Sequence, residues 1–283
     1  MIRKLPITIS VLACLVLLGA CGTKKTPTST TAATQNTCTP AKLQTIKKGK
    51  LTVATDKPAY PPYFENNDPT NGKGFESAVA YAIAKQLGYS TAQVKWVTEP
   101  FDSSYAPGPK HFDFDVNEIS ITKPRENEVD FSSPYYQAPQ AIVVAKGSKY
   151  IGATSLSALK DASIGVQIGT TSLDAVNSNI KPSKQPKVFN NSNDVVTALK
   201  QHQVDAVVVD LPTAFYLTSA QVPSAKIVGQ FSAPGGDTWG ALLGKGSPLT
   251  SCVNRAVGQL RSSGQLGQIT HRWMGGANAP ELS

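Results

Sequence analysis

Charged residues, histidines and cysteines are all scarce in this chain of 283 residues, and each scarcity argues against a class of function. Charged residues make up 16% of the sequence, and the basic ones form no stripe with interleaved aromatic residues, so we expect no nucleic-acid partner. The three histidines, His111, His202 and His271, lie far apart and lack the spacing of metal ligands. No motif of a serine or cysteine nucleophile accompanies them. We therefore expect no catalytic residue, no metal and no other cofactor.

The apolar run from Leu5 to Leu18 is too short to cross a bilayer comfortably, and Arg3 and Lys4 precede it. This pattern is typical of a secretory signal peptide, which we assign to residues 1–20. The ending Leu18-Gly19-Ala20-Cys21 resembles the lipobox of bacterial lipoproteins, in which the chain is cut before the cysteine and the thiol is joined to diacylglycerol. Two acyl chains on one residue would hold the protein on a membrane. The alternative is an ordinary signal peptide in which Cys21 is incidental.

The segment behind Cys21 is rich in Thr, Lys, Ala, Ser and Gln and has no apolar period, so it cannot bury enough surface to fold. We assign residues 21–39 to a flexible tether. Roughly 245 residues follow it, enough for one large domain or for two lobes of ordinary size. The formal charge of +8 falls to +6 without residues 1–20, which carry two basic residues and no acidic one.

Four cysteines are present, and two of them belong to the N-terminal region. Cys14 leaves with the signal peptide and Cys21 is the lipidation candidate, which leaves Cys38 and Cys252 as a pair in an oxidising compartment. A disulfide between them would join the start of the folded chain to a helix near its end. Two unpaired thiols are the alternative.

Strand and helix patterns alternate along the rest of the chain. Residues 50–55 alternate like a strand, the apolar residues from Phe75 to Leu87 follow a helical period that ends at Gly88, and a second strand follows at 94–97. Further strands are expected at 141–145, 163–166 and 205–209, with helices at 194–199 and 249–260. Alternating strands and helices predict an α/β fold.

Three segments carry residues suited to binding a ligand. Asp56–Tyr63 follows the first strand directly, at the edge where open α/β sheets hold ligands, and its prolines would fix the rings of Tyr60 and Tyr63. Ser120–Arg125 reads as a short strand running into a loop, and the Arg fork suits a planar carboxylate. The alternative is a surface Arg125 that pairs with Glu126 or Glu128.

The third segment is Gln167–Ser172, where a strand ends in a glycine turn and hydroxyl residues begin a helix. Free backbone N–H groups at a helix start suit a carboxylate. On its own, this segment is equally consistent with an ordinary helix cap.

The order of these segments resembles solute-binding protein family 3, the binding proteins of bacterial ABC importers for polar amino acids. The resemblance covers about residues 47–276. It rests on Thr55-Asp56, Ala59-Tyr60-Pro61-Pro62, Gly74-Phe75-Glu76, Ser120-Ile121-Thr122, Pro124-Arg125-Glu126, Val129-Asp130-Phe131-Ser132, Pro134-Tyr135-Tyr136, Gly165-Val166-Gln167, Gly169-Thr170-Thr171, Val204-Asp205-Ala206-Val207 and Asp210.

The resemblance implies an α/β, two-lobe, periplasmic-binding-protein-like (type II) fold with two crossover hinge strands, in which the lobes close around a ligand. Lobe 1 would comprise residues 40–141 and 236–283, and lobe 2 residues 142–235. Arg125 would bind the α-carboxylate of the ligand, and Asp210 its α-ammonium, so that both charges of a zwitterion are paired. The supporting residues would be Ser120, Thr170 and Thr171 at the carboxylate, and Tyr60 and Phe101 on either side of the ligand's side chain.

Two stretches next to the expected pocket depart from the family pattern. Val116-Asn117-Glu118-Ile119 replaces small residues, and the insert Tyr105–Lys110 replaces an apolar helix and turn. Glu118 and Asp56 would favour a ligand with a cationic or amide side chain. Glu118 pointing away from the pocket is the alternative.

The resemblance implies a monomeric, extracytoplasmic protein that is anchored to the cell membrane by lipid and delivers a polar amino acid to an ABC permease in the membrane. Two other readings stay open. One is an enzyme of the cyclohexadienyl dehydratase type, which shares the fold, and the other is a ligand-sensing module for a separate membrane receptor. The sequence shows no transmembrane pattern after residue 21, so we expect ligand or signal to pass to another protein.

Overall fold

The computed structural model describes residues 37–233, 235–275 and 278–283. The signal peptide of residues 1–20, the lipidation candidate Cys21 and most of the tether of residues 21–39 lie outside the described residues.

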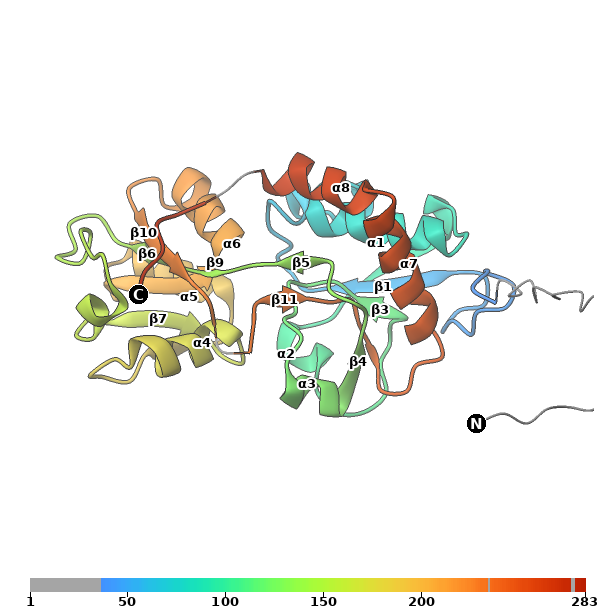
Figure 1. Cartoon of the computed structure of the whole chain (residues 1–283), viewed down its shortest axis with the longest axis horizontal. Helices are drawn as coiled ribbons and strands as arrows, with labels where there is room; N and C mark the ends of the chain where they lie inside the picture. Colours follow the sequence, from blue (N-terminus) through green and yellow to red (C-terminus); the bar gives the residue numbers. More distant parts are fainter. Residues whose placement is uncertain (1–36, 234, 276–277) are drawn as a thin grey trace, which may run out of the picture. The chain divides into compact units, whose positions relative to one another are not determined.

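Two five-stranded sheets form the centres of two lobes (Figure 1). We call the first sheet and its helices lobe 1, and the second sheet and its helices lobe 2. The strands of lobe 1, in the order β2-β1-β3-β12-β4, are β1 (Leu51–Thr55), β2 (Val94–Thr98), β3 (Phe114–Asp115), β4 (Val129–Phe131) and β12 (Leu242–Gly244). The strands of lobe 2, in the order β10-β6-β9-β7-β8, are β6 (Gln140–Val144), β7 (Ile164–Gln167), β8 (Lys187–Phe189), β9 (Ala206–Asp210) and β10 (Lys226–Phe231).

Each sheet combines parallel and antiparallel strands. β1 runs parallel to β2 and β3, and β7 runs parallel to β8 and β9, so the carboxyl ends of these strands gather at one edge of each sheet. β12 in lobe 1 and β6 in lobe 2 run antiparallel to their neighbours. Both follow a segment that crosses from the other lobe.

Within residues 37–233 and 235–275, two crossing segments connect the lobes and pair with each other. β5 (Tyr136–Gln137) leads from lobe 1 to lobe 2, and β11 (Thr238–Trp239) leads back. They form a two-stranded antiparallel sheet in which Trp239 lies opposite Tyr136 (Figure 1). The two-lobe fold with two crossover strands, as expected from the sequence, is confirmed.

The helices of lobe 1 are α1 (Phe75–Gln86), α2 (Phe101–Ser104), α3 (Lys123–Glu128), α7 (Thr250–Ser262) and α8 (Gln265–Met274). Those of lobe 2 are α4 (Thr171–Ala175), α5 (Ser192–Lys200) and α6 (Leu211–Tyr216), with α4 and α6 continuing as single π-helical turns over Val176–Ile180 and Leu217–Gln221. Short 3₁₀ helices occupy Glu65–Asn67, Pro69–Asn71, Thr91–Gln93 and Leu156–Leu159.

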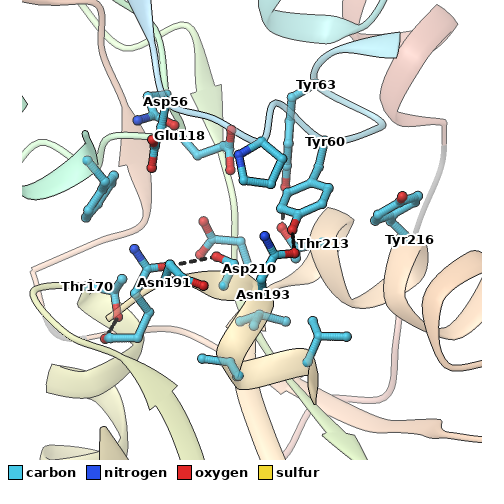
Figure 2. Close-up of a pocket in the computed structure, with 18 of the residues that line it drawn as sticks. Asp56, Tyr60, Tyr63, Glu118, Thr170, Asn191, Asn193, Asp210, Thr213 and Tyr216 are labelled. Atoms are coloured by element: carbon cyan, nitrogen blue, oxygen red, sulfur yellow. Dashed lines mark hydrogen bonds between the residues drawn. The ribbon is translucent and has the colours of Figure 1, made fainter. Parts of the chain in front are cut away.

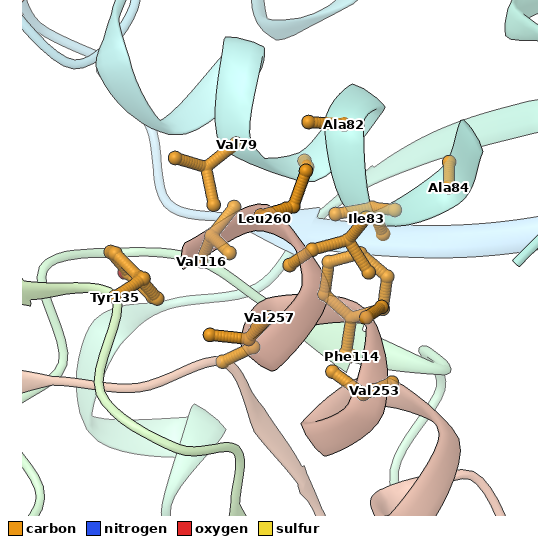
Figure 3. Packing of buried hydrophobic residues seen from close by; sticks show 14 of the residues in the cluster. Val79, Ala82, Ile83, Ala84, Phe114, Val116, Tyr135, Val253, Val257 and Leu260 are labelled. Carbon is orange, nitrogen blue, oxygen red and sulfur yellow. The ribbon is translucent and has the colours of Figure 1, made fainter. Parts of the chain in front are cut away.

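The core of lobe 1 lies between α1, α7 and the sheet (Figure 3). The apolar period read from the sequence buries Val79 and Ile83 of α1 against Val257 and Leu260 of α7. Lobe 2 is covered on both faces of its sheet: Ile142 packs in one cluster and its neighbour Val143 in another. Burial on both faces explains the continuous apolar strands of this lobe.

Cys38 and Cys252 form a disulfide, with their Cα atoms 5.4 Å apart. The bond joins the start of the described chain to α7, as the cysteine count suggested.

The last six residues correct one predicted boundary. Residues 236–283 were assigned to lobe 1, but Leu282 packs in a core cluster of lobe 2. Gln230 of β10 donates its backbone N–H to Pro280 and accepts one from Leu282, so residues 278–283 run along the edge of β10. Gly229 makes this close approach possible, because a Cβ there would lie 2.4 Å from the Leu282 side chain.

Candidate functional site

A cavity lies where the carboxyl ends of the parallel strands of both lobes meet. From lobe 1 it is lined by the end of β1, the loop behind it, Phe101 and the 117–120 stretch, and from lobe 2 by the starts of α4, α5 and α6. Of the residues predicted to bind ligand, eight line the cavity: Asp56, Tyr60, Phe101, Glu118, Ser120, Thr170, Thr171 and Asp210. The ninth, Arg125, does not line it.

Arg125 lies directly behind the cavity wall and is 7% exposed. Its Nη1 donates to the Ser120 carbonyl at 2.7 Å, and its Nη2 donates to the Gly169 carbonyl at 2.9 Å. The guanidinium lies over the ring of Tyr105, at 4.6 Å, and that of Phe101, at 5.4 Å. Its hydrogen-bond partner Ser120 belongs to the cavity wall, and so does Thr170, the residue after Gly169. The alternative, a surface Arg125 paired with Glu126 or Glu128, is not observed; Glu126 pairs with Lys123 instead.

The segment around Arg125 is more regular than predicted. Residues 120–125 were read as a short strand and a loop, but Lys123–Glu128 forms α3. Thr122 caps this helix by accepting the Arg125 N–H, and Pro124 in the first turn already has a helical φ. The helix turns Arg125 back toward Ser120, which forms an isolated bridge with Trp239 of the crossing strand.

Thr170, Thr171 and Ser172 begin α4 as predicted. The Thr170 side chain accepts the N–H of Leu173, a regular N-cap. The Thr171 hydroxyl lies 3.3 Å from the Ser120 hydroxyl, so one hydroxyl from each lobe meets at this wall of the cavity.

Tyr60 and Tyr63 connect the loop of lobe 1 to helices of lobe 2 (Figure 2). The Tyr60 hydroxyl donates to Asn193, and its ring lies 6.0 Å from that of Tyr216. The Tyr63 hydroxyl lies 2.8 Å from that of Thr213. Both rings therefore close one side of the cavity by direct contact between the lobes.

Asp210 ends β9 and reaches the cavity from lobe 2 (Figure 2). Burial and the nearby Asp237 raise the pKa of Asp210 to about 7, although the hydrogen bond from Gln140 and the charge of Arg125 act in the opposite direction. Among the described residues, no cation lies within ion-pair distance of Asp210.

Glu118 lines the cavity. The alternative, in which Glu118 points away from the pocket, is not observed. Its backbone is in the left-handed region, at φ 49°, and its N–H donates to Glu76 at 2.8 Å. Glu76 is fully buried at the start of α1 and also accepts the Tyr135 hydroxyl. Burial and the charges of Glu76, Asp210 and Asp56 raise the pKa of Glu118 well above its usual range.

Asp56 adds a third carboxyl to the cavity wall (Figure 2). It accepts the N–H of Lys57 at 2.6 Å. Burial raises its pKa, with a smaller contribution from the charge of Asp102. Asp56, Glu118 and Asp210 give the cavity an excess of acidic groups, which is suited to a ligand of positive charge.

Sequence reasoning missed the part of the wall formed by Asn191, Asn193, Thr213 and Tyr216. The signal for the two asparagines was present, since Asn190-Asn191-Ser192-Asn193 directly follows β8, a parallel strand. The rule that predicted a site behind β1 applies equally to this strand end. No comparable signal marks Thr213 and Tyr216, which lie within α6.

A family model describing bacterial extracellular solute-binding proteins, family 3, matches residues 51–276. The chain belongs to this family. The family description and the names of its relatives indicate substrate-binding proteins rather than enzymes. Among the described residues, no helix is both long and apolar enough to cross a membrane.

Relatives in family 3 include amino-acid-binding proteins. L-cystine-binding protein TcyJ of Escherichia coli (strain K12) is 27% identical over 235 residues, which are 81% of this chain and 84% of that protein. The structure of an ancestral arginine-binding protein bound to glutamine matches with a TM-score of 0.68 and 33% identity, covering 81% of this chain and 99% of that one. An ancestral amino-acid-binding protein that is a precursor of cyclohexadienyl dehydratase matches with a TM-score of 0.65 and 29% identity, over 80% of this chain and 95% of that one.

Proposed function

We propose that this protein captures an amino acid with a cationic side chain outside the cytoplasm, encloses it between its two lobes and delivers it to the permease of an ABC importer. The amino acid would lie in the cavity between β1, α4 and β9, with its charged groups toward Arg125, Asp210, Glu118 and Asp56.

The observation that carries this proposal is a pair of oppositely charged groups that have no ion-pair partner among the described residues. Arg125 is buried and Asp210 is partly buried, and in the described part of the chain neither has an ion-pair partner within 4.0 Å. Buried charges are costly unless they are paired. A zwitterion supplies one charge of each sign, its α-carboxylate to Arg125 and its α-ammonium to Asp210.

The Arg125 guanidinium retains N–H groups for the ligand. The Ser120 and Gly169 carbonyls take two of its five N–H groups, so we propose that the α-carboxylate accepts from the remaining ones. A carboxylate accepts from a guanidinium more strongly than a carbonyl does, because both partners carry charge. The hydroxyls of Ser120 and Thr171 are placed to donate to the same carboxylate.

The proposal that the ligand has a cationic side chain rests on two further carboxyls, those of Glu118 and Asp56. Both line the cavity, and both have raised pKa values because they are buried near other acids. A guanidinium or ammonium group would offset this repulsion and return them to their charged forms. The related structure described as an ancestral arginine-binding protein bound to arginine is consistent with such a ligand.

A thermal-shift screen of the purified protein, unfolded and refolded to remove carried-over ligand, tests the proposal. A ligand at about a hundred times its Kd stabilises the fold by about 2.7 kcal/mol, so a true ligand raises the melting temperature clearly. We expect L-arginine and L-lysine to give the largest shifts among the common amino acids. The absence of a shift with every amino acid, for a well-folded protein, would overturn the proposal.

We further propose that Cys21 carries a diacylglycerol anchor, on the strength of the Leu18–Cys21 motif alone. The variant Cys21→Ser, expressed in a bacterium with its own signal peptide, should appear in the extracytoplasmic soluble fraction. Continued sedimentation with membranes would argue against the anchor.

A further inference from the structure

Gln140 is fully buried at the start of β6, where the first crossing segment enters lobe 2. It does not line the cavity, and the sequence offered no reason to single it out. Its side chain nevertheless contacts three polar groups that matter to the site: Asp210, Ser172 and Asp237.

The side-chain amide of Gln140 is oriented by these contacts. Its Nε2 donates to Asp210 Oδ1 at 2.5 Å and lies 3.5 Å from Asp237 Oδ1. Its Oε1 accepts the hydroxyl of Ser172 at 2.5 Å. Ionised carboxylates can only accept, and the amide nitrogen has two hydrogens to donate, so one N–H is available for each acid.

We propose that Gln140 is a positioning residue, which holds the Asp210 carboxylate toward the cavity and keeps it ionised for the α-ammonium of the ligand. This inference rests on the proposed function, which assigns Asp210 that role. Gln140 acts through Asp210 and does not touch the ligand itself.

The electrostatic surroundings of Asp210 explain why such a residue is needed. Asp237 lies 3.5 Å from the Gln140 nitrogen that donates to Asp210, and Glu76 and Glu118 add negative charge from lobe 1. Arg125 is the cation that acts on Asp210. Burial and three acids favour the protonated form, which cannot pair with an ammonium group. A hydrogen bond donated to the carboxylate favours the charged form.

Gln140 also links the site to both crossing segments. It follows the first segment directly, and Asp237 precedes β11 in the second. Asp237 is itself fixed, because its Oδ2 accepts the N–H of Ala233 at 3.1 Å and its carbonyl accepts that of Ala138 at 2.7 Å. Asp210 is therefore held by Gln140, which is fixed next to the two crossing segments that connect the lobes.

The test uses Gln140→Met, which keeps the side-chain length but removes the donor, and Gln140→Glu, which keeps the acceptor for Ser172. The first readout is the pKa of Asp210 in the ligand-free protein, followed by carbon-13 NMR of its carboxyl group. We expect both variants to raise it, Gln140→Glu the more. Gln230→Met removes the hydrogen bonds of another buried glutamine in the same sheet, away from the cavity, and should leave it unchanged.

The second readout is calorimetric affinity for two probes, L-arginine and 5-guanidinopentanoic acid, which lacks the α-ammonium. We expect Gln140→Met to weaken L-arginine binding by about tenfold to a hundredfold, the range for a hydrogen bond to a charged group, and the analogue much less. Equal losses for both probes would show a merely structural role, and an unchanged pKa of Asp210 would overturn the inference. If the wild type binds neither probe, the cationic ligand class fails, and the NMR titration still decides whether Gln140 controls Asp210.

Discussion

The Nη2 atom of Arg125 in lobe 1 donates a 2.9 Å hydrogen bond to the carbonyl oxygen of Gly169 in lobe 2. Gly169 has a φ of +72°, and a Cβ on it would lie 2.3 Å from the Tyr105 hydroxyl of lobe 1. The turn before α4 therefore approaches lobe 1 so closely that a side chain at position 169 would have to displace the Tyr105 hydroxyl.

Gly169→Ala should weaken ligand binding, because the added methyl group separates the two lobes where they close on the ligand. We expect a loss of roughly tenfold in affinity, measured by calorimetry, from the clash and the left-handed backbone together. Gly147→Ala is the matched control, since Gly147 has φ +80° but nothing within 4 Å of its Cβ position. It should cost about 1 kcal/mol of stability and leave affinity unchanged. Wild-type affinity in Gly169→Ala would show that this contact is absent from the ligand-bound state.

Arg125→Ala should reduce affinity for an amino acid by about 2 to 5 kcal/mol, the usual cost of removing one member of a buried charge pair. Arg125→Lys keeps the charge but not the two parallel donors, so its loss should be smaller and still measurable. Both variants should keep the circular-dichroism spectrum of the wild type. Near-native binding by Arg125→Ala would remove Arg125 from the site.

The contribution of Asp210 to amino-acid affinity should rise with pH up to about 7 and then level off. Burial raises the pKa of Asp210 to about 7, so below that pH the carboxyl must lose a proton before it can pair with the α-ammonium. If binding releases a single proton, the affinity rises about tenfold per pH unit below the pKa. Titrations in two buffers of different ionisation enthalpy would detect the released proton. Asp210→Asn should bind weakly and with a shallower slope, because Glu118 and Asp56 still lose protons to the ligand; an undiminished slope in that variant would place the proton on Glu118 or Asp56 instead of Asp210.

Much of this fold could be predicted because its signals are local. The strand at 50–55, the helix from Phe75 and the cap at Thr170 each depend on residues within one element, and all three are found. The family motifs then supplied the lobes and most of the cavity wall. What was missed depends on contacts between distant residues. Glu76 and Glu118 meet across 42 residues, and Tyr60 and Asn193 across 133.

Two errors have physical causes that the sequence does not display. α3 was read as a loop because six residues with Pro124 carry no helical period, yet the Thr122 cap and the burial of Arg125 stabilise it. The C-terminal residues were given to lobe 1 because the resemblance to the family implied that boundary. Their position on lobe 2 depends on Gly229 and on the room it leaves for Leu282.

Stability without ligand should fall as pH rises from about 4.5 to about 7, and Glu76 should account for much of the change. Burial raises the pKa of Glu76 from 4.5 to about 7, so the folded state binds its proton more tightly than the unfolded state does. The free energy of unfolding therefore decreases with pH between these values and is flat above them. The share of Glu76 is at most about 3 kcal/mol.

The variant Glu76→Gln tests this assignment by urea unfolding at pH 5 and pH 8. The amide still accepts the Glu118 N–H, and it cannot ionise, so the difference in stability between the two pH values should shrink. Glu128→Gln changes an exposed carboxyl and should reproduce the wild-type difference. An undiminished difference in Glu76→Gln would assign the effect to the other buried acids.

The Cys38–Cys252 disulfide should stabilise the protein by constraining the unfolded chain. The two cysteines are 214 residues apart, so the bond closes a loop that spans both lobes. Such bonds typically contribute about 2 to 4 kcal/mol. Cys38→Ser, Cys252→Ser and the double variant should therefore lose the same free energy of unfolding, measured in urea, because each removes the same bond.

Reductant should lower the stability of the wild type to that of the double variant and leave the double variant unchanged. A larger loss in Cys252→Ser than in the double variant would point to a liability of the lone Cys38 thiol, and no loss in any of the three would mean that the bond does not form in the folded protein.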